Sequence, residues 1–360
     1  MAQEKITQQI IAEKLKISVP TVSKALSGHP DVNDETQTRV INLATQLGYA
    51  VPGRSKKEKE STVAKHHLVG VFVVTASDQF QDINYFAGMS STYAKMNISL
   101  LFHYCSAEEC ELILSPEYQP PAMRDKLLSG VILVNQWPPT IVEKLYARVP
   151  CVSIVNNFTD LNIDVIGIDE SDGIARLMDH LFQLGHRKIG FFTSEGMIGR
   201  DAARFGAYTA SIYRLGLEFE PDFVCGMSGG ILDDPKMSFD LQIKHVVEQI
   251  RRGVRAWMCT SNPIGYELCR RLTGYGFNVP AEVSITGFGD GDDGGSGCPK
   301  LTTVDIPYLS VGAEAVKRLL SRLRHPTSPK IKVKLQCKLK KGQTTAAPSS
   351  DSEPVLKKEA

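Results

Sequence analysis

Hydroxyl and lysine groups crowd one short segment near the amino terminus. Residues 18–27 read SVPTVSKALS, which brings Ser18, Thr21, Ser23 and Lys24 close together. These groups can bind rather than catalyse, because hydroxyls and the free amides of a helix start bind phosphate oxygens, and exposed residues of a first turn reach base edges. The segment has almost no apolar face, so we expect its polar groups to meet another molecule.

Three short helices would position these groups. We expect the first to begin at Thr7, the second at Ser18 with Pro20 in its first turn, and the third at Asn33. Apolar residues at helical spacing join the helices and leave five side chains of the second facing outward, namely Val19, Pro20, Thr21, Ser23 and Lys24. Two short helices with a tight turn are typical of a helix-turn-helix that enters the major groove. From this pattern alone, a small helical bundle with a polar surface is the alternative.

The residue composition changes three times along the chain. The 360 residues are 42% hydrophobic, enough for two or three domains, and the net charge of +1 indicates no particular partner. We expect a headpiece at 1–50, a hinge or linker at 51–67 with a local excess of positive charge, and a disordered tail at 346–360. Between them, apolar runs such as GVILV and CVSIV alternate with amphipathic helices. This alternation predicts an α/β core of two doubly wound parallel sheets.

One core helix has a predicted end. The segment DGIARLMDHLFQLGHRK carries apolar residues at helical spacing, and Gly185 is expected to end it. His186, Arg187 and Lys188 follow, where cations stabilise a helix carboxyl terminus. Near the end of the chain, residues 330–341 alternate lysine with apolar residues, which predicts half-exposed edge strands.

Composition and motifs argue against secreted, membrane-spanning, metal-binding and dinucleotide-binding proteins. Eight cysteines without a CxxC pair or a histidine at metal spacing are typical of a reduced, intracellular protein. The charged amino terminus is unlike a signal peptide, and no apolar run approaches the roughly 20 residues that span a bilayer. GDGDDG at 289–294 matches a dinucleotide motif, but its aspartates would repel a pyrophosphate. We therefore expect a cytoplasmic protein with no metal, no cofactor, no membrane association and no catalytic set.

The headpiece motif resembles the DNA-binding domain of the lactose-repressor (LacI/GalR) family. The segment ISVPTVSKALSGHPDVNDETQTRVINLATQLGY carries the likeness, and LLSGVILV, QLGHRKIGFF, RFGAYTAS, GFNVPAEVSITGFGD, LTTVDIPYLSVGAEAVKRLL and KLKKGQTT continue it in order. It covers residues 5–345. The resemblance implies a homodimeric regulator, most simply a repressor of sugar genes, that binds double-stranded operator DNA. It also implies a periplasmic-binding-protein-like core with a small-molecule effector between two subdomains.

The resemblance assigns roles to residues and ranges. Thr7, Ser18, Thr21 and Ser23 would hold phosphates, and Val19, Pro20 and Lys24 would face bases. Asn33 and Arg54 complete the expected DNA-binding set. The first core subdomain would take residues 68–160 and 292–325, and the second would take 161–291 and 326–345. The effector would contact Phe80, Arg204, Asn262 and Asp290.

The chain departs from the family pattern in two places. The linker PGRSKKEKEST lacks the leucine that wedges into the minor groove, so we expect weaker DNA bending and a stronger salt dependence. In the cleft, Asn262 stands where an aspartate is usual, and Gly289 displaces another to Asp290. Fewer carboxylates beside Arg204 predict a more positive pocket for a phosphorylated or acidic sugar. Alternatively, the pocket has degenerated, and control is lost or passed to a partner protein. A solute-binding protein of the same core fold is the rival class, which the headpiece argues against.

Overall fold

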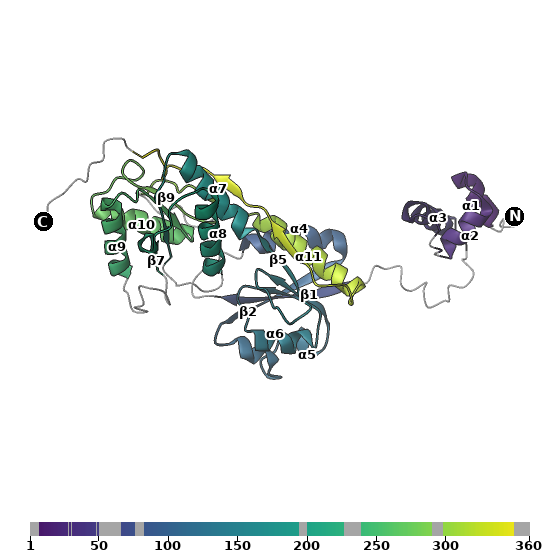
Figure 1. The fold of residues 1–360 in the computed structure, drawn as a ribbon. Coiled ribbons are helices and arrows are strands. Elements are labelled where there is room, and N and C mark those ends of the chain that lie inside the picture. The colour runs from purple at the N-terminus through teal and green to yellow at the C-terminus, as the bar shows by residue number, and fades with distance from the viewer. Residues whose placement is uncertain are drawn as a thin grey trace. The chain divides into compact units, whose positions relative to one another are not determined.

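The computed structural model describes residues 7–27, 29, 31–47, 49, 66–75, 83–193, 200–226, 239–289 and 298–348. The chain divides into two compact units, Met1–His66 and His67–Ala360 (Figure 1). The predictions for Arg54, Phe80, Asp290 and most of the linker lie outside the described residues, as does the tail from residue 349. No helix in the described ranges is long and apolar enough to cross a membrane.

The first unit contains the three predicted helices, α1 (Gln8–Leu15), α2 (Val19–Leu26) and α3 (Asp34–Gln46). One small core joins them, made of Ile11, Ala12, Val22, Ala25, Val40 and Ala44. Asn33 caps α3, because its Oδ1 accepts a 2.8 Å hydrogen bond from the amide of Thr36. Thr7 occupies the N-cap position of α1 as predicted, but its side chain makes no capping bond.

The second unit begins with a parallel six-stranded sheet in the order β11-β5-β4-β3-β1-β2. Its strands are β1 (His67–Thr75), β2 (Ile98–Ser106), β3 (Leu128–Val134), β4 (Cys151–Ile154), β5 (Asp164–Ile168) and β11 (Lys332–Leu335). Helices α4 (Ile83–Met96) and α11 (Tyr308–Arg324) cover one face. The other face packs against η2 (Cys110–Leu114), α5 (Pro121–Arg124) and α6 (Pro139–Tyr146). The two helices α4 and α11 touch through backbone, since a Cβ on Gly88 would lie 2.0 Å from the carbonyl oxygen of Leu309.

A second parallel sheet has the order β7-β6-β8-β9. Its strands are β6 (Ile189–Phe192), β7 (Val224–Cys225), β8 (Ala256–Cys259) and β9 (Ser284–Thr286). Helices α7 (Glu170–Gln183) and α8 (Arg200–Arg214) pack on one face, and α9 (Phe239–Arg251) and α10 (Asn262–Gly274) pack on the other. The short η3 (Pro221–Phe223) precedes β7, and a separate antiparallel pair joins β10 (Thr303–Asp305) to β12 (Lys338–Lys340). The two doubly wound sheets are therefore confirmed.

The predicted subdomain boundaries need correction. Residues 161–168 and 326–335 were assigned to the second subdomain, but β5 and β11 are strands of the first sheet. Residues 298–306 were assigned to the first subdomain, but Thr302 bridges to Thr286 of the second sheet and Val304 packs in its core. An apolar strand pattern indicates that a strand is buried but not which sheet it joins, so the sequence alone does not assign the segments that cross between the two sheets. The half-exposed edge strands predicted near residue 330 are confirmed as β11 and β12.

Two buried histidines hold the carboxyl-terminal segment. His186 Nε2 lies 2.9 Å from the carbonyl oxygen of Ala346, and His180 Nε2 lies 2.9 Å from Thr345 Oγ1. Burial lowers the pKa of both imidazoles, so the prediction of His186 as a helix-end cation is wrong. Arg187 does serve as a cap, donating to the carbonyl oxygen of Phe182 at 2.9 Å. Ala346 is anchored by these bonds, which corrects the predicted start of the disordered tail.

Candidate functional site

The polar residues of α2 form one exposed face. Val22 and Ala25 are buried against α1 and α3, while Val19, Pro20, Ser23 and Lys24 are exposed and Thr21 is half-buried. Ser18 starts the helix as predicted, since its Oγ accepts the amide of Thr21 at 3.2 Å. The same Oγ lies 2.7 Å from Thr21 Oγ1. The predicted outward set is therefore brought together on a helix of eight residues, with Val19, Pro20 and Thr21 in its first turn, where free amides point outward, and Lys24 in its last turn.

Lys24 forms an ion pair that no local sequence pattern predicts. Its Nζ donates to Asp31 Oδ2 at 2.9 Å, and His29 Nδ1 lies 3.4 Å from the same oxygen. Lys24 and Asp31 are seven positions apart, beyond the spacing of a helical ion pair, and only the turn after α2 brings them together. Lys24 therefore does not extend freely from the helix.

Arg204 is buried and anchored inside the second subdomain. Its Nε donates to Glu170 Oε2 at 2.7 Å, its Nη2 donates to Glu170 Oε1 at 3.2 Å, and its Nη1 donates to the carbonyl oxygen of Thr260. The guanidinium carbon lies 3.9 Å from the centroid of the Phe288 ring. The expected excess of positive charge at Arg204 is wrong, because Glu170 neutralises it. Two of the five guanidinium N–H groups are not used by these bonds.

Asn262 is also committed to protein partners. Its Nδ2 donates to the carbonyl oxygen of Gly289, and its Oδ1 accepts from Thr303 Oγ1 at 2.8 Å. It thus ties the start of α10 to the segment that follows β9 and to the first residue of β10. An ionised aspartate at position 262 could not donate to the carbonyl oxygen of Gly289, so this hydrogen bond explains why an asparagine is present there. Neighbouring Ser261 caps α10 by accepting the amide of Ile264 at 3.5 Å.

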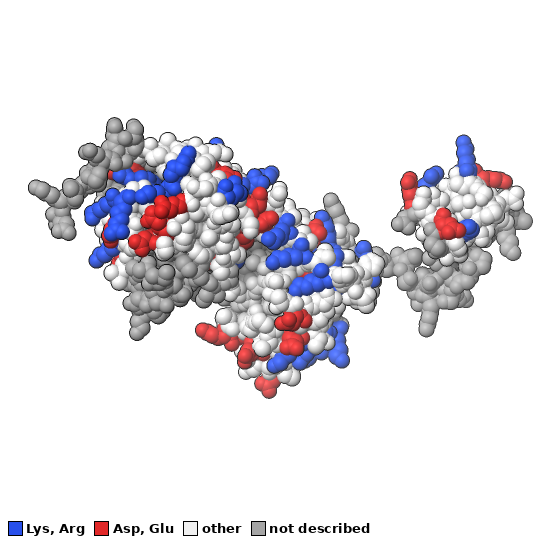
Figure 2. Space-filling view, viewed as in Figure 1, with Lys and Arg blue, Asp and Glu red and all other residues white. Residues whose placement is uncertain are grey.

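A cavity of about 410 Å³ lies where the carboxyl ends of β3, β4 and β5 approach the start of α8. Its lining includes Asn156, Trp137 and the acidic Glu170. Three cations also line it, and they are Arg200, Lys332 and Lys334. Basic side chains gather over β11 and α11 in the space-filling view (Figure 2). Among the residues described around this cavity, neither Arg204 nor Asn262 contributes to the lining, although both were predicted to contact an effector.

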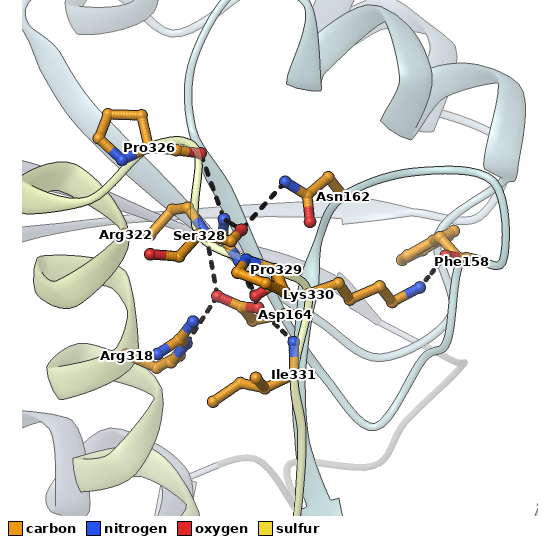
Figure 3. Close-up of polar contacts among 10 residues, drawn as sticks. All are labelled: Phe158, Asn162, Asp164, Arg318, Arg322, Pro326, Ser328, Pro329, Lys330 and Ile331. Atoms are coloured by element: carbon orange, nitrogen blue, oxygen red, sulfur yellow. Dashed lines mark hydrogen bonds and ion pairs between the residues drawn. The ribbon is translucent and has the colours of Figure 1, made fainter.

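A buried ion cluster fixes the amino-terminal end of β5 (Figure 3). Asp164 is fully buried and accepts from Arg318 Nε at 2.7 Å, from Arg322 Nη2 at 2.6 Å and from the amide of Ile331 at 2.8 Å. Arg322 also donates to the carbonyl oxygens of Pro326, Ser328 and Pro329. One carboxylate and two guanidinium groups therefore clamp the turn between α11 and β11 onto β5.

The described residues offer no constellation for metal binding, since no group of three or more histidine, cysteine, aspartate or glutamate side chains could hold an ion. Burial raises the pKa of the Cys151 and Cys225 thiols to about 12, so these side chains act as small apolar groups.

Known proteins share this architecture. A family model described as a periplasmic binding protein-like domain matches residues 178–345. The HTH-type transcriptional repressor MelR of Bacillus subtilis is 26% identical over 347 residues, which cover 89% of this chain and 92% of that protein. The transcriptional regulator CelR in complex with cellobiose has a TM-score of 0.63 at 19% identity, covering 94% of this chain and 99% of that one. The lac repressor dimer bound to operator and an anti-inducer has a TM-score of 0.60 at 19% identity, covering 96% and 100%. The two-sheet core with amino-terminal helices is thus a shared fold.

Proposed function

This chain belongs to the LacI/GalR family of transcriptional regulators, and from that premise we propose that it represses genes of sugar uptake or breakdown. As a member of that family it is a DNA-binding regulator and not an enzyme. The proposal has three further parts: which residues meet operator DNA, how the chain dimerises, and what the effector is. The exposed polar face of α2 is the observation that carries the first of them.

In this proposal α2 enters the major groove of a pseudo-palindromic operator. Thr7, Ser18, Thr21 and Ser23 hold phosphates, and Asn33 and Arg54 add contacts to the backbone. Val19, Pro20 and Lys24 face base edges. The exposure of Val19, Pro20 and Lys24 on one side of α2 supports this division, because base contacts need side chains that reach past the helix surface.

Replacing Lys24 with alanine tests the role of this residue. If Lys24 contacts a base, Lys24→Ala should relax sequence preference by about 1–3 kcal/mol at one base position, because a base acceptor loses its donor. The measurement is binding to a panel of single-base operator variants, with the operator obtained by selection from random duplexes. Equal losses on every duplex would make Lys24 a phosphate contact instead. Deleting residues 1–60 should abolish binding to all of them.

A homodimer is supported by an exposed apolar patch on an edge strand. β2 lies at one end of the first sheet, where Phe102 is 37% exposed and Tyr104 is 50% exposed. Both rings pack edge-on against Phe86 of α4, with centroids 4.8 Å and 6.1 Å away. Exposed aromatic side chains on the end strand of the described sheet favour association with another chain. A second copy would bring two helical units to the two half-sites of an operator.

The proposed effector is a phosphorylated or otherwise acidic sugar in the inter-subdomain cleft. A cavity of about 410 Å³ is in the usual range for small-molecule sites. Glu170 already pairs with Arg204, and Lys334 lies 3.7 Å from Asp169, so Arg200 and Lys332 leave the lining with an excess of positive charge. Arg204 and Asn262 lie outside the lining of this cavity, so in this proposal they meet the sugar, alongside Phe80 and Asp290, only where the ligand extends beyond the cavity to the unused N–H groups of Arg204. Regulation requires that this ligand favour one conformation of the core over another.

A thermal-shift panel of neutral, acidic and phosphorylated sugars tests this assignment. A ligand at a hundred times its Kd stabilises the folded core by about 2.7 kcal/mol, which shifts the midpoint measurably. We expect a charged sugar to shift the wild type and to lose most of its effect in Lys332→Gln. Lys340→Gln, on β12 and outside the cavity lining, is the matched control. A shift with neutral sugars alone would refute the acidic class. No shift with any sugar would favour control by a partner protein.

A further inference from the structure

The contact between Lys24 and Asp31 constrains the one basic side chain of α2. The helix VPTVSKAL carries no other lysine or arginine, and no acid. Its ammonium donates one hydrogen bond to Asp31 at 2.9 Å, while the two side chains are 49% and 60% exposed. A lysine ammonium has three N–H donors, so two are left for another molecule. Asp31 can therefore hold Lys24 in place while Lys24 contacts a second acceptor.

Asp31 is itself held in the turn after α2. Its backbone amide donates to His29 Nδ1 at 3.3 Å, and the amide of His29 donates to the carbonyl oxygen of Lys24 at 3.0 Å. On the other side, Ser27 Oγ donates to the carbonyl oxygen of Lys24 at 3.0 Å. These local bonds connect the end of α2 to the residue that receives its lysine. The carboxylate is consequently a positioned acceptor within the turn.

The ion pair between Lys24 and Asp31 limits how α2 can attract phosphates. The headpiece residues 1–50 contain five basic and five acidic side chains, so they supply no general attraction to phosphates. A lysine free to move would attach to any phosphate it met, and phosphate contacts carry no sequence information. Pairing with Asp31 holds the ammonium in one position. It can then bind only an acceptor that lies next to that position, and not any phosphate nearby.

We propose that Asp31 is a positioning residue that makes Lys24 sequence-selective. It holds the ammonium on the outer side of α2, where two N–H groups can meet base acceptors in the major groove, and it keeps the charge from phosphates. Guanine offers two such acceptors, O6 and N7, on its major-groove edge. This inference rests on the proposed DNA-binding function and adds a determinant of its specificity.

The test compares full-length wild type with Asp31→Asn, Lys24→Ala and the double variant. Each binds two labelled duplexes, the one that wild type selects from a random pool and a scrambled one, over a range of salt concentrations. We expect Asp31→Asn to lower the ratio of selected to scrambled affinity roughly fivefold, the scale of an exposed ion pair. On the scrambled duplex its salt slope should steepen by about one, because Lys24 then neutralises a phosphate. In the Lys24→Ala background, Asp31→Asn should not change the ratio.

Two controls make the result specific. Asp31→Glu keeps a carboxylate and should retain most of the wild-type ratio, whereas Glu13→Gln changes the same charge on exposed α1 and should leave the ratio unchanged. An equal gain for Asp31→Asn on both duplexes, with or without Lys24, would overturn the proposal and leave Asp31 as a repulsive charge only. If wild type selects no sequence from the pool, the proposed function fails, and the inference fails with it.

Discussion

Replacing Asp164 with asparagine is expected to lower the free energy of unfolding of the core by about 3–5 kcal/mol, the cost of removing one partner from a buried ion pair. The carboxylate is fully buried, and Arg322 is 3% exposed. Without the negative charge, Arg318 and Arg322 keep two positive charges close together at the start of β5. The turn that carries the carbonyl partners of Arg322 should loosen as well.

Urea titration followed by tryptophan fluorescence measures this effect. Trp137 lies in the core of the first sheet and Trp257 in that of the second, so a Trp257→Phe background isolates the subdomain that contains Asp164. Asp125→Asn is the matched control, because Asp125 forms an exposed ion pair with Arg124 at 3.3 Å in the same subdomain. The control should cost less than about 1 kcal/mol. Equal losses in the two variants would show that the buried cluster contributes no more than a surface pair.

The Asp164 contribution should also depend on pH. Burial alone would raise the pKa of this carboxyl group, but hydrogen bonds from Arg322, Arg318 and the amide of Ile331 outweigh burial and hold the pKa below its ordinary value of 3.8. A depressed pKa in the folded state means that the contribution is present above the unfolded-state pKa and is lost as pH falls through the folded-state value. The free energies of unfolding of wild type and Asp164→Asn should therefore differ by the full amount at pH 7. They should become equal only in strong acid.

How much the sequence revealed depends on the range of the contacts. Local patterns are sufficient to predict the helices of the headpiece. Ser18, two residues before Pro20, predicts the start of α2, and Asn33 predicts the start of α3. Alternating apolar runs were sufficient for the two sheets, because burial on both faces leaves a continuous apolar stretch. The same runs could not assign β5 and β11 to a sheet, since that choice depends on crossovers between distant segments.

The electrostatic contacts were the least predictable. Glu170 lies thirty-four positions from Arg204, and Asp164 lies more than a hundred and fifty from its two arginines. Charged residues of both signs are common in any sequence, and nothing local marks which of them fold together. The glycine at position 289 was visible in the sequence, whereas the pairing of Arg204 with Glu170 was not. The prediction of a positive charge at Arg204 failed for this reason.

Replacing Arg204 with methionine should destabilise the second subdomain by about 3–5 kcal/mol, because Glu170 then keeps a largely buried charge without its partner. The Thr260 carbonyl would lose a donor, and the Phe288 ring would lose the cation that lies over it. Glu170 begins α7, Arg204 lies on α8 and Thr260 follows β8, so the loss would loosen three elements at one end of the sheet. Urea titration in a Trp137→Phe background, which leaves Trp257 as the reporter, measures it.

A double-variant cycle with Glu170→Met separates the pair from its surroundings. Removing both charges should cost less than the sum of the single variants, with a coupling of about 1–3 kcal/mol, because neither charge is then left buried alone. Additive losses would contradict the pairing seen here. The same double variant decides what Arg204 does for the effector: a sugar that still raises its unfolding midpoint by the wild-type amount needs neither residue. A sugar that no longer raises the unfolding midpoint of the double variant depends on one of these two side chains. It needs either the two unused N–H groups of Arg204 or the carboxylate of Glu170. The two single variants distinguish these cases.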